Sequence, residues 1–504
     1  MNKNILLSKS KIKDHFLKCP RILWHELNFH KKEWDAKDNF LFDQGREVES
    51  IARSRFPNAV LQDKQANLDK LDFTEKFLVE HPNTELFEAA FYAKNTIIQF
   101  DILCPNPNKT YNAIEVKSSS SFKNDYHLDV LCQYWIATYA GLKIEKFELW
   151  YINKNKASDC ESEDYFTKED ITEFVKANEK LFLTAHAGAL ETALNKDKMP
   201  QVKCSSNCEE CPFRNTEQCK VEVTEQSVLA LPNFRNKYKM FNLGIQNTLD
   251  LPEDLLNKVN PNVIKALKTN ALVIDRENLM NELSQWIFPL NFFDFETLTL
   301  AIPILKNQRP YEQKVIQFSN HQLNSLNDLT MKHTSFLHTN TSCPDIPVIE
   351  AMLDTLLPTK GSIVAYNDSF EKTRINELIK YYPQYQKDLE SIVNRFVDLM
   401  DIIKSCVYHP SFMGSYSLKV VSPVLLKEYG SYSDSLIKSG GEISSYYMKM
   451  INSNDVQEKK AISDSLEKYC KYDTLNLFLV LKYLLDQNVD LKQLVELNLG
   501  IKHD

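Results

Sequence analysis

The chain has 504 residues, of which 43% are hydrophobic and 25% charged, and its formal net charge is −8. This length exceeds one ordinary core, so two or three domains are expected, and the composition is typical of a soluble globular protein. The absence of 18 consecutive apolar residues, of a signal h-region and of GxGxxG or GxxxxGK(S/T) motifs excludes a membrane partner and glycine-rich phosphate loops. The expected location is the cytoplasm.

Two helical stretches are predicted at the start of the chain. Residues 8–34 read as largely helical, with a break at Pro20, directly after Cys19. A further helix around Gln44–Ala52 carries Glu49. A glutamate of this kind is ordinarily a surface charge, so only its context can give Glu49 a role.

Charged residues occupy an apolar β-hairpin predicted over residues 97–119. Asp101 lies in its first strand, a turn rich in Pro and Asn follows, and Glu115 and Lys117 lie in its second strand. Side chains alternate along a strand, so Glu115 and Lys117 share a face. Asp101 and Glu115 can share a metal ion, and Lys117 can polarise the attacking water. A solvated Glu/Lys pair is the alternative, but an acid inside an apolar strand disfavours it.

This arrangement resembles the PD-(D/E)XK nuclease superfamily, RecB-like branch. Gly45-x-x-Val48-Glu49 is similar to the first helical motif of that branch, and Gln133 to its downstream glutamine, although Ala137 replaces the usual tyrosine four residues later. The resemblance implies a restriction-endonuclease-like fold for residues 1–222. The implied site residues are the metal ligands Asp101 and Glu115, the catalytic Lys117, and the supporting Glu49 and Gln133.

Four cysteines crowd into one short segment after the hairpin, namely Cys204, Cys208, Cys211 and Cys219. In a reducing compartment such density indicates a metal site, and four cysteines can close a zinc site unaided. The chain also resembles RecB-like nucleases with a closing cysteine cluster, including the CRISPR-associated exonucleases, which pair three such cysteines with one far upstream. Cys19 occupies the upstream place. A 4Fe-4S cluster is therefore implied, zinc stays the alternative, and either Cys204 or Cys208 is surplus.

Residues 223–285 contain helical patches without a chemical motif and are predicted to form a helical linker. After this segment, two carboxylates alternate with aromatic residues in Phe292–Thr297. In a strand, Asp294 and Glu296 project to one face, where they repel each other and resist burial. A divalent cation bound by both acids would stabilise this arrangement, and a solvated edge strand is the alternative.

Two further motifs follow along the chain, Asn367-x-x-Phe370-Glu371 after a predicted strand and Tyr469-x-x-x-Asp473 at the start of an apolar helix. With the Asp-x-Glu strand they resemble the DEDDy branch of the DEDD exonucleases, which have an RNase H-like fold. The order of motifs also looks like a bacterial domain family of unknown function found downstream of RecB-like nuclease domains. The implied ligands of Mg²⁺ or Mn²⁺ are Asp294, Glu296, Glu371 and Asp473.

The same resemblance implies that Tyr469, one helical turn before Asp473, orients the attacking water. Glu371 stands where most of the superfamily has Asp, and a register shift of three residues would make Asp368 the ligand instead. Lys419, in a turn between the last two motifs, is expected to be a solvated surface lysine, with contact to a phosphate as the alternative.

The sequence thus predicts an α/β protein with two nuclease domains, residues 1–222 and 286–504, joined by the helical linker. The expected reaction is metal-dependent hydrolysis of phosphodiester bonds. The implied substrate is DNA rather than RNA, cut exonucleolytically in repair or in defence against phages and mobile elements. The alternatives are a nucleic-acid-binding protein that has lost catalysis and an iron–sulfur scaffold in a larger complex. The sequence indicates no particular protein partner.

Overall fold

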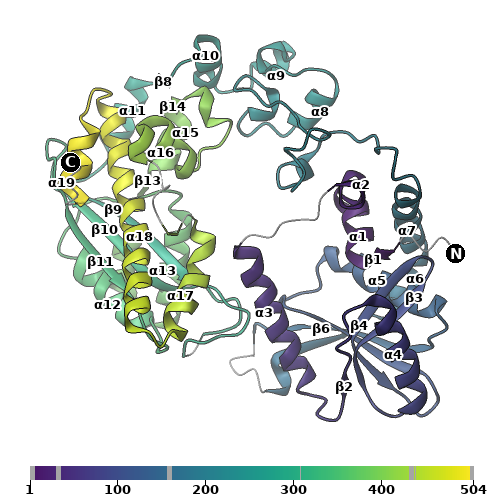
Figure 1. Cartoon of the computed structure of the whole chain (residues 1–504). Helices are drawn as coiled ribbons and strands as arrows, with labels where there is room; N and C mark the ends of the chain where they lie inside the picture. Colours follow the sequence, from purple (N-terminus) through teal and green to yellow (C-terminus); the bar gives the residue numbers. More distant parts are fainter. Residues whose placement is uncertain are drawn as a thin grey trace. The chain divides into compact units, whose positions relative to one another are not determined.

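The computed structural model describes residues 6–29, 36–155, 162–306, 308–430, 436–437 and 439–499. The chain divides into two compact units, one formed by Met1–Val221 with Leu300–Tyr311 and the other by Glu222–Thr299 with Glu312–Asp504. Each unit has its own β-sheet with helices packed against it, so the protein is of the α/β class (Figure 1). Among the described helices, none is both long and apolar enough to cross a bilayer.

The first unit is built on a seven-stranded sheet of order β2-β3-β4-β5-β6-β7, with β1 paired to β4. The strands are β1 Leu7–Ser8, β2 Val60–Leu61, β3 Leu86–Ala93, β4 Thr96–Pro105, β5 Tyr111–Lys117, β6 Ile144–Ile152 and β7 Phe166–Asp170. Strands β4 and β5 form the antiparallel hairpin expected from the sequence, with Ile102 opposite Ile114. Strand β6 runs parallel to β5.

Helices pack against this sheet and bury Phe100, Leu131, Phe147 and Phe182 in one core. They are α1 Lys9–Lys13, the π-helix η1 Asp14–Lys18, α2 Pro20–Asn28, α3 Ala36–Arg53, α4 Asn67–Glu80, α5 Asn124–Tyr139, α6 Thr172–Ala177 and α7 Glu179–Leu194. The break predicted at Pro20 is present, because Cys19 is extended and Pro20 occupies the first position of α2, where no backbone N–H is needed. Part of the predicted 8–34 stretch, residues 30–34, lies outside the described residues.

The second unit contains a five-stranded sheet of order β11-β10-β9-β12-β13. Its strands are β9 Leu290–Leu298, β10 Lys314–Leu323, β11 Lys332–Leu337, β12 Ile363–Ala365 and β13 Phe396–Asp398. Strands β9, β10 and β11 are antiparallel neighbours, whereas β12 runs parallel to β9 and β13.

Helices cover both faces of β9. The face that carries Phe292, Asp294 and Glu296 lies against α18 Val456–Leu485, and the ring of Phe292 contacts that of Phe478. Phe293 points to the other face, where it joins a core formed with the helices α12 Asp345–Leu356, α13 Ser369–Tyr381 and α14 Gln386–Val393. Figure 1 shows the long yellow-green α18 beside the strands. The alternation along β9 therefore sends its acids toward α18.

The predicted linker is an integral part of the second unit. Its elements are α8 Lys237–Asn242, α9 Glu253–Leu256, α10 Pro261–Thr269, β8 Val273–Ile274 and α11 Arg276–Leu283. Apolar residues such as Val263 and Leu279 join the core that also contains Phe478, and β8 pairs with β14 Val407–Tyr408. Residues 222–285, named the helical module below, therefore pack into the core of the second unit and do not form a separate linker. The remaining helices of the unit are α15 Leu399–Cys406, α16 Leu418–Leu426, α17 Ile443–Asn452 and α19 Leu491–Leu499.

Candidate active sites

Three carboxylates meet in the second unit, those of Asp294, Glu296 and Asp473. One oxygen of each lies within 4.8 Å of the others. Oxygen ligands lie about 2.0–2.6 Å from a bound Mg²⁺ or Ca²⁺ ion, so one divalent cation could contact all three. Strand β9 supplies two of the acids from one face, and the packing of α18 on that face supplies the third. The residues fit a divalent metal ion.

Burial and mutual repulsion make these acids retain protons. Burial first, and then the charges of Asp473, Glu296 and Glu371, raise the pKa of Asp294 well above its usual value. Burial and Asp473 raise the pKa of Glu296 in the same way, while Lys419 partly offsets this effect. A divalent cation would replace the protons and relieve the repulsion.

Glu371 adds negative charge to this site without joining the group of three ligand oxygens. Its side chain is buried, and Oε2 has no hydrogen-bond partner among the described residues. Burial, followed by the charges of Asp368 and Asp398, raises the pKa of Glu371 to about 8. Asp368 instead forms an ion pair with Lys372 at 2.5 Å. Three of the four acids predicted as ligands are therefore together, and the fourth lies within electrostatic range.

Tyr469 lies on α18 one turn before Asp473 and lines a cavity together with the three acids. Burial and the neighbouring Asp473 raise the pKa of its hydroxyl, so the group stays protonated and can donate a hydrogen bond. The ammonium of Lys419 lies 5.6 Å from the centre of the Tyr469 ring. A hydroxyl donor and a cation thus accompany the three acids.

The acids line a cavity of about 670 Å³ whose wall also includes Tyr366, Asn367, Tyr416 and Lys419. Lys419 is exposed, as expected for a surface lysine, and its side chain also lines this cavity. Its loop is held against the helical module at Gly414, which has a φ of +79° and at which a Cβ atom would lie 2.5 Å from the carbonyl oxygen of Ala230. Only glycine permits this approach, and no local sequence pattern reveals where the loop then goes.

A second cavity of about 250 Å³ shares Asn233, Lys404 and Tyr416 with the first. The helical module forms much of its wall. The other lining residues are Pro232, Phe234, Leu255, Lys258, Val259, Asn260 and Val263. The cavity lined by the three acids thus adjoins a space that offers aromatic surface and two lysines.

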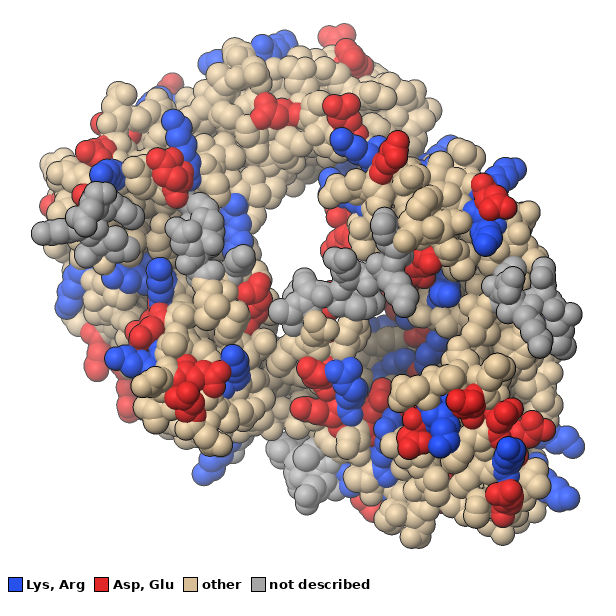
Figure 2. Space-filling view, in the orientation of Figure 1, with Lys and Arg blue, Asp and Glu red and all other residues tan. Residues whose placement is uncertain are grey.

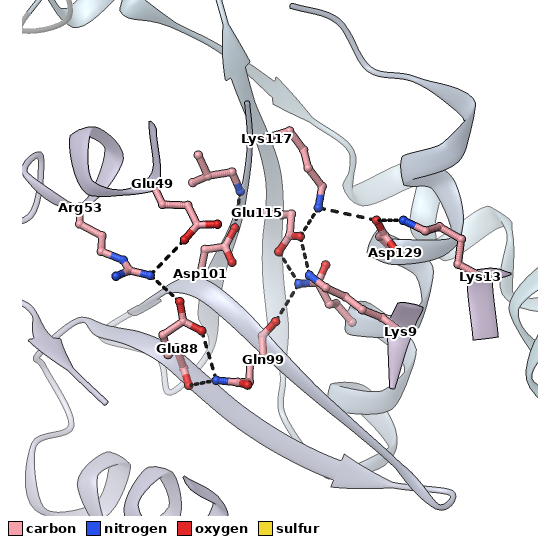
Figure 3. A network of polar contacts seen from close by, with 12 residues as sticks. Lys9, Lys13, Glu49, Arg53, Glu88, Gln99, Asp101, Glu115, Lys117 and Asp129 are labelled. Carbon is pink, nitrogen blue, oxygen red and sulfur yellow. Dashed lines mark hydrogen bonds and ion pairs between the residues drawn. The ribbon is translucent and has the colours of Figure 1, made fainter. Parts of the chain in front are cut away.

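Glu115 is the centre of a polar network in the first unit (Figure 3). Its Oε1 accepts hydrogen bonds from Lys117 Nζ and Lys9 Nζ, both at 2.6 Å, and its Oε2 accepts one from Gln133 Nε2. Burial alone would raise the pKa of Glu115, but Lys117 and Lys9 lower it to about 2. Glu115 is therefore ionised and surrounded by donors.

Asp101 faces Glu115 across the hairpin, and its Oδ2 accepts a hydrogen bond from the backbone N–H of Val116 at 2.6 Å. Burial and the charge of Glu115 raise the pKa of Asp101 well above its usual value. Glu49 lies beside Arg53, at 3.4 Å, and the same arginine pairs with Glu88. The described residues of this unit contain no set of three ligand atoms within 4.8 Å of one another.

The structure gathers all five residues predicted for this site, Asp101, Glu115, Lys117, Gln133 and Glu49. Sequence reasoning missed Lys9 and Lys13 of α1, which pair with Glu115 and Asp129, the latter at 2.9 Å. Lysines near the start of a helix have no catalytic signature. It also missed Glu88, although a lone acid in an apolar strand was the signal that identified Asp101.

The five predicted cluster cysteines lie in one neighbourhood. The charges of Cys208, Cys211 and Cys219 act on the thiol of Cys19, and Cys204 interacts with Cys208. No three of these described sulfurs lie within 4.8 Å of one another. Tetrahedral zinc with Zn–S bonds of about 2.3 Å places its sulfurs roughly 3.8 Å apart, an arrangement that no three of the described cysteines have.

Hydrogen bonds tie the segment around Cys19 to the segment around the downstream cysteines. Asn207 Nδ2 donates to the carbonyl oxygens of Leu17 and Lys18, at 3.2 and 2.8 Å. Arg21 donates to the carbonyl oxygens of Pro200 and Gln218, at 2.9 and 3.0 Å. The two ends of the first unit are therefore joined where the cysteines meet.

Figure 2 shows acidic and basic side chains interspersed on the face drawn, without a large field of one sign. This distribution agrees with the modest net charge of −8. Any attraction for a polyanion would therefore have to come from local groups such as the cavity lysines.

Comparisons with known proteins give distant relatives. The sequence model of a family described as "Domain of unknown function (DUF2779)" matches residues 291–417, which include Asp294, Glu296 and Glu371 but end before Tyr469. The uncharacterized protein MG366 of Mycoplasma genitalium is 25% identical over 214 residues, which is 39% of this chain and 32% of that protein. Its homolog in Mycoplasma pneumoniae is 24% identical over 198 residues, covering 36% and 30%.

The uncharacterized protein UU173 of Ureaplasma parvum is 26% identical over 155 residues, covering 27% of this chain and 21% of that protein. The matched parts thus span at most 32% of the length of these relatives. A solved structure titled "Crystal structure of SSO0001" aligns with 44% of this chain and 89% of that chain at 16% identity, with a TM-score of 0.21. A TM-score of this size carries no argument about fold or function.

Proposed function

We propose that the chain is a metal-dependent nuclease that hydrolyses phosphodiester bonds, with an RNase H-like, DEDDy-type exonuclease site in the second unit. One observation supports this best. The carboxylates of Asp294, Glu296 and Asp473 have oxygens within 4.8 Å of one another and line a cavity of about 670 Å³. Buried acids that repel each other destabilise a protein unless a cation binds them, and divalent cations promote hydrolysis of phosphodiesters.

The residues around the acids have separate tasks in this proposal. Mg²⁺ or Mn²⁺, when bound, would stabilise charge on the attacking and leaving oxygens. Tyr469, protonated and one turn from Asp473, orients the attacking water through its hydroxyl. Lys419 lines the same cavity and binds a non-bridging oxygen of the phosphate. Glu371, whose charge acts on Asp294, would be the fourth acid of the metal site.

The substrate is a nucleic acid strand. The adjoining cavity offers Phe234 and Tyr416 for contact with bases, and Lys258 and Lys404 for phosphates. Stacking on aromatic rings combined with lysine contacts to the backbone is the usual way in which proteins hold single strands. DNA is the expected nucleic acid because of the resemblance to RecB-like nucleases, and RNA is the alternative.

The first unit is a candidate for a second nuclease site of the PD-(D/E)XK type. Asp101 and Glu115 would hold the metal, Lys117 would polarise the water, and Glu49 and Gln133 would position these groups. Cys19 together with three of the four downstream cysteines would hold a 4Fe-4S cluster. The resemblance to RecB-like nucleases with a closing cysteine cluster favours this cluster over zinc. A cytoplasmic role in repair or defence fits such a pair of sites.

The test uses the full chain, purified anaerobically and incubated with Mn²⁺ or Mg²⁺ and end-labelled single- and double-stranded DNA and RNA. Wild type is compared with Asp294→Asn, Asp101→Asn and the double variant. We expect release of short products, reduced by each single substitution and abolished by both. Undiminished cleavage by the double variant would contradict both sites. Binding of nucleic acid without cleavage under every condition would instead support a binding protein that has lost catalysis.

A further inference from the structure

The carboxylate of Glu115 is almost fully occupied by donors from its own chain (Figure 3). Its Oε1 accepts from two ammonium groups, Lys9 Nζ and Lys117 Nζ, each at 2.6 Å, and its Oε2 accepts from Gln133. A carboxylate has about four lone-pair directions, so three of them are in use. A metal ion that approaches Glu115 Oε1 therefore meets the positive charge of two ammonium groups.

The three donors differ in how readily they can leave. Gln133 is completely buried and also donates to the backbone carbonyl oxygen of Gln99 at 2.8 Å. The side chain of Lys117 is 17% exposed and also lies 3.7 Å from Asp129. The side chain of Lys9 is 29% exposed and begins the short helix α1. Lys9 is thus the donor with the easiest path to solvent.

The charges of the network show what Lys9 contributes. Four bases, Lys9, Lys13, Arg53 and Lys117, face five acids, Glu49, Glu88, Asp101, Glu115 and Asp129. The positive side chains nearly balance the negative ones. In the second unit, Asp294, Glu296, Glu371 and Asp473 have Lys419 as a nearby counter-charge. The excess negative charge that a divalent cation would neutralise is therefore much smaller in the first unit than in the second.

We propose that Lys9 is an internal competitor of the divalent cation in the first unit. Its ammonium occupies the position at Glu115 Oε1 that the metal needs, so an ion binds Asp101 and Glu115 only after Lys9 has moved away. The first unit consequently takes up metal at higher concentrations than the second unit does. This inference rests on the proposed function, in which Asp101 and Glu115 are metal ligands.

The two units can then respond to different metal concentrations. An ammonium and a divalent cation within a few ångströms repel strongly where water is scarce, so the two do not share one carboxylate oxygen. Removal of the Lys9 ammonium should leave the Glu115 carboxylate in the same position, because Lys117 and Gln133 still donate hydrogen bonds to it. The substitution therefore changes the affinity for metal rather than the architecture of the site.

The experiment measures Mn²⁺ binding to the full chain by titration calorimetry, in an Asp294→Asn/Asp473→Asn background that disables the second site. Lys9→Met keeps the length and apolar stem of the side chain and removes its charge. We expect the Kd of the first unit for Mn²⁺ to fall by about tenfold or more. Lys11→Met, on the same helix and near the backbone of Leu6, is the matched control and should leave the Kd within about twofold.

An unchanged or higher Kd in Lys9→Met would overturn the proposal, as would the absence of Mn²⁺ binding to the first unit in that variant. Lys9→Gln, which keeps a hydrogen-bond donor without charge, must also lower the Kd and serves if Lys9→Met does not fold. Cleavage is assayed separately in protein with Asp294 and Asp473 intact. If Lys9→Met does not lower the Kd for Mn²⁺ while the protein still cleaves nucleic acid, this inference alone is refuted. Metal binding without any cleavage would instead refute the proposed function.

Discussion

Asp294 on β9 and Asp473 on α18 place carboxylate oxygens within 4.8 Å of each other, although one lies in the central strand of the sheet and the other in a helix near the end of the chain. Their proximity depends on α18 packing against β9 and β10. Glu296 completes the group because it lies two residues after Asp294 on the same face of the strand. This relationship underlies the predictions for the second unit.

Asp294→Asn should stabilise the metal-free second unit and abolish its cleavage activity. Burial and the neighbouring acids raise the pKa of Asp294, so its protonated form stabilises the fold and this stabilisation is lost as the pH rises. The asparagine side chain stays uncharged at every pH and therefore avoids this loss. In a unit of this size each kcal/mol gained raises the Tm by about 2–4 °C, which calorimetry in EDTA at pH 8 would detect. Asp388→Asn, at an exposed position, is the control. A lower Tm in EDTA would mean that Asp294 is structural.

Glu371 should make the stability of the metal-free protein depend on pH. Its pKa is raised from 4.5 to about 8 on folding, so the folded state binds an extra proton over this range. The resulting stability is complete below about pH 4.5 and disappears as the pH rises to about 8. The slope can reach about 1.4 kcal/mol per pH unit. Urea unfolding in EDTA, repeated across this pH range, should show that the free energy of unfolding depends less steeply on pH in Glu371→Gln than in wild type. An equal pH dependence in the two proteins would refute this assignment.

The role of Glu371 in cleavage has a separate test. Glu371→Asp restores the residue that is common in DEDD exonucleases and should keep or raise the cleavage rate, whereas Glu371→Gln should abolish it. Asp368 is tied to Lys372, so Asp368→Asn should have little effect. A fully active Glu371→Gln together with an inactive Asp368→Asn would show that the second motif is three residues out of register.

Tyr469→Phe should reduce turnover more than metal binding. The hydroxyl is expected to contact water, and the ring, which lies under Lys419, is kept. We expect kcat to fall by about 10²-fold or more, as for loss of a group that positions a reactant, with the Kd for Mn²⁺ nearly unchanged. Single-turnover assays and calorimetry measure the two quantities. Equal losses in both would place Tyr469 among the groups that maintain the metal site.

Lys258→Ala should weaken binding of a nucleic acid strand at the cavity next to the acids. An oligonucleotide should show a KM raised by about threefold to tenfold, because one phosphate contact is lost. Bis-p-nitrophenyl phosphate is too short to reach that cavity and should be hydrolysed as by wild type. Lys268→Ala, on the exposed side of the same helical module, is the matched control. Equal effects of Lys258→Ala on both substrates would exclude a role for the second cavity in strand binding.

The cysteine neighbourhood should hold an iron–sulfur cluster. Anaerobically purified protein is expected to be brown, with absorption near about 400 nm from thiolate–iron charge transfer. Cys211→Ala should remove the colour and lower the Tm of the first unit, because the cluster would join the segments around Cys19 and Cys219. A colourless protein that contains one equivalent of zinc would end the iron–sulfur interpretation.

The sequence alone determined the local geometry of both candidate sites. Alternation along a strand places Asp294 beside Glu296, one helical turn places Tyr469 beside Asp473, and the hairpin pairs Asp101 with the strand of Glu115. These relationships follow from the periods of about 2 residues in a strand and about 3.6 residues in a helix, which can be read from a short stretch of sequence.

Only the tertiary structure decided which distant groups join the sites. Lys9 reaches Glu115 because α1 packs on α5 and beside β4, and Lys419 enters the cavity because Gly414 lets its loop approach the backbone of Ala230. The helical module is a wall of the second unit because its apolar residues complete that unit's core. Such contacts depend on how whole helices and loops pack together, and no period or short motif in the sequence encodes that packing.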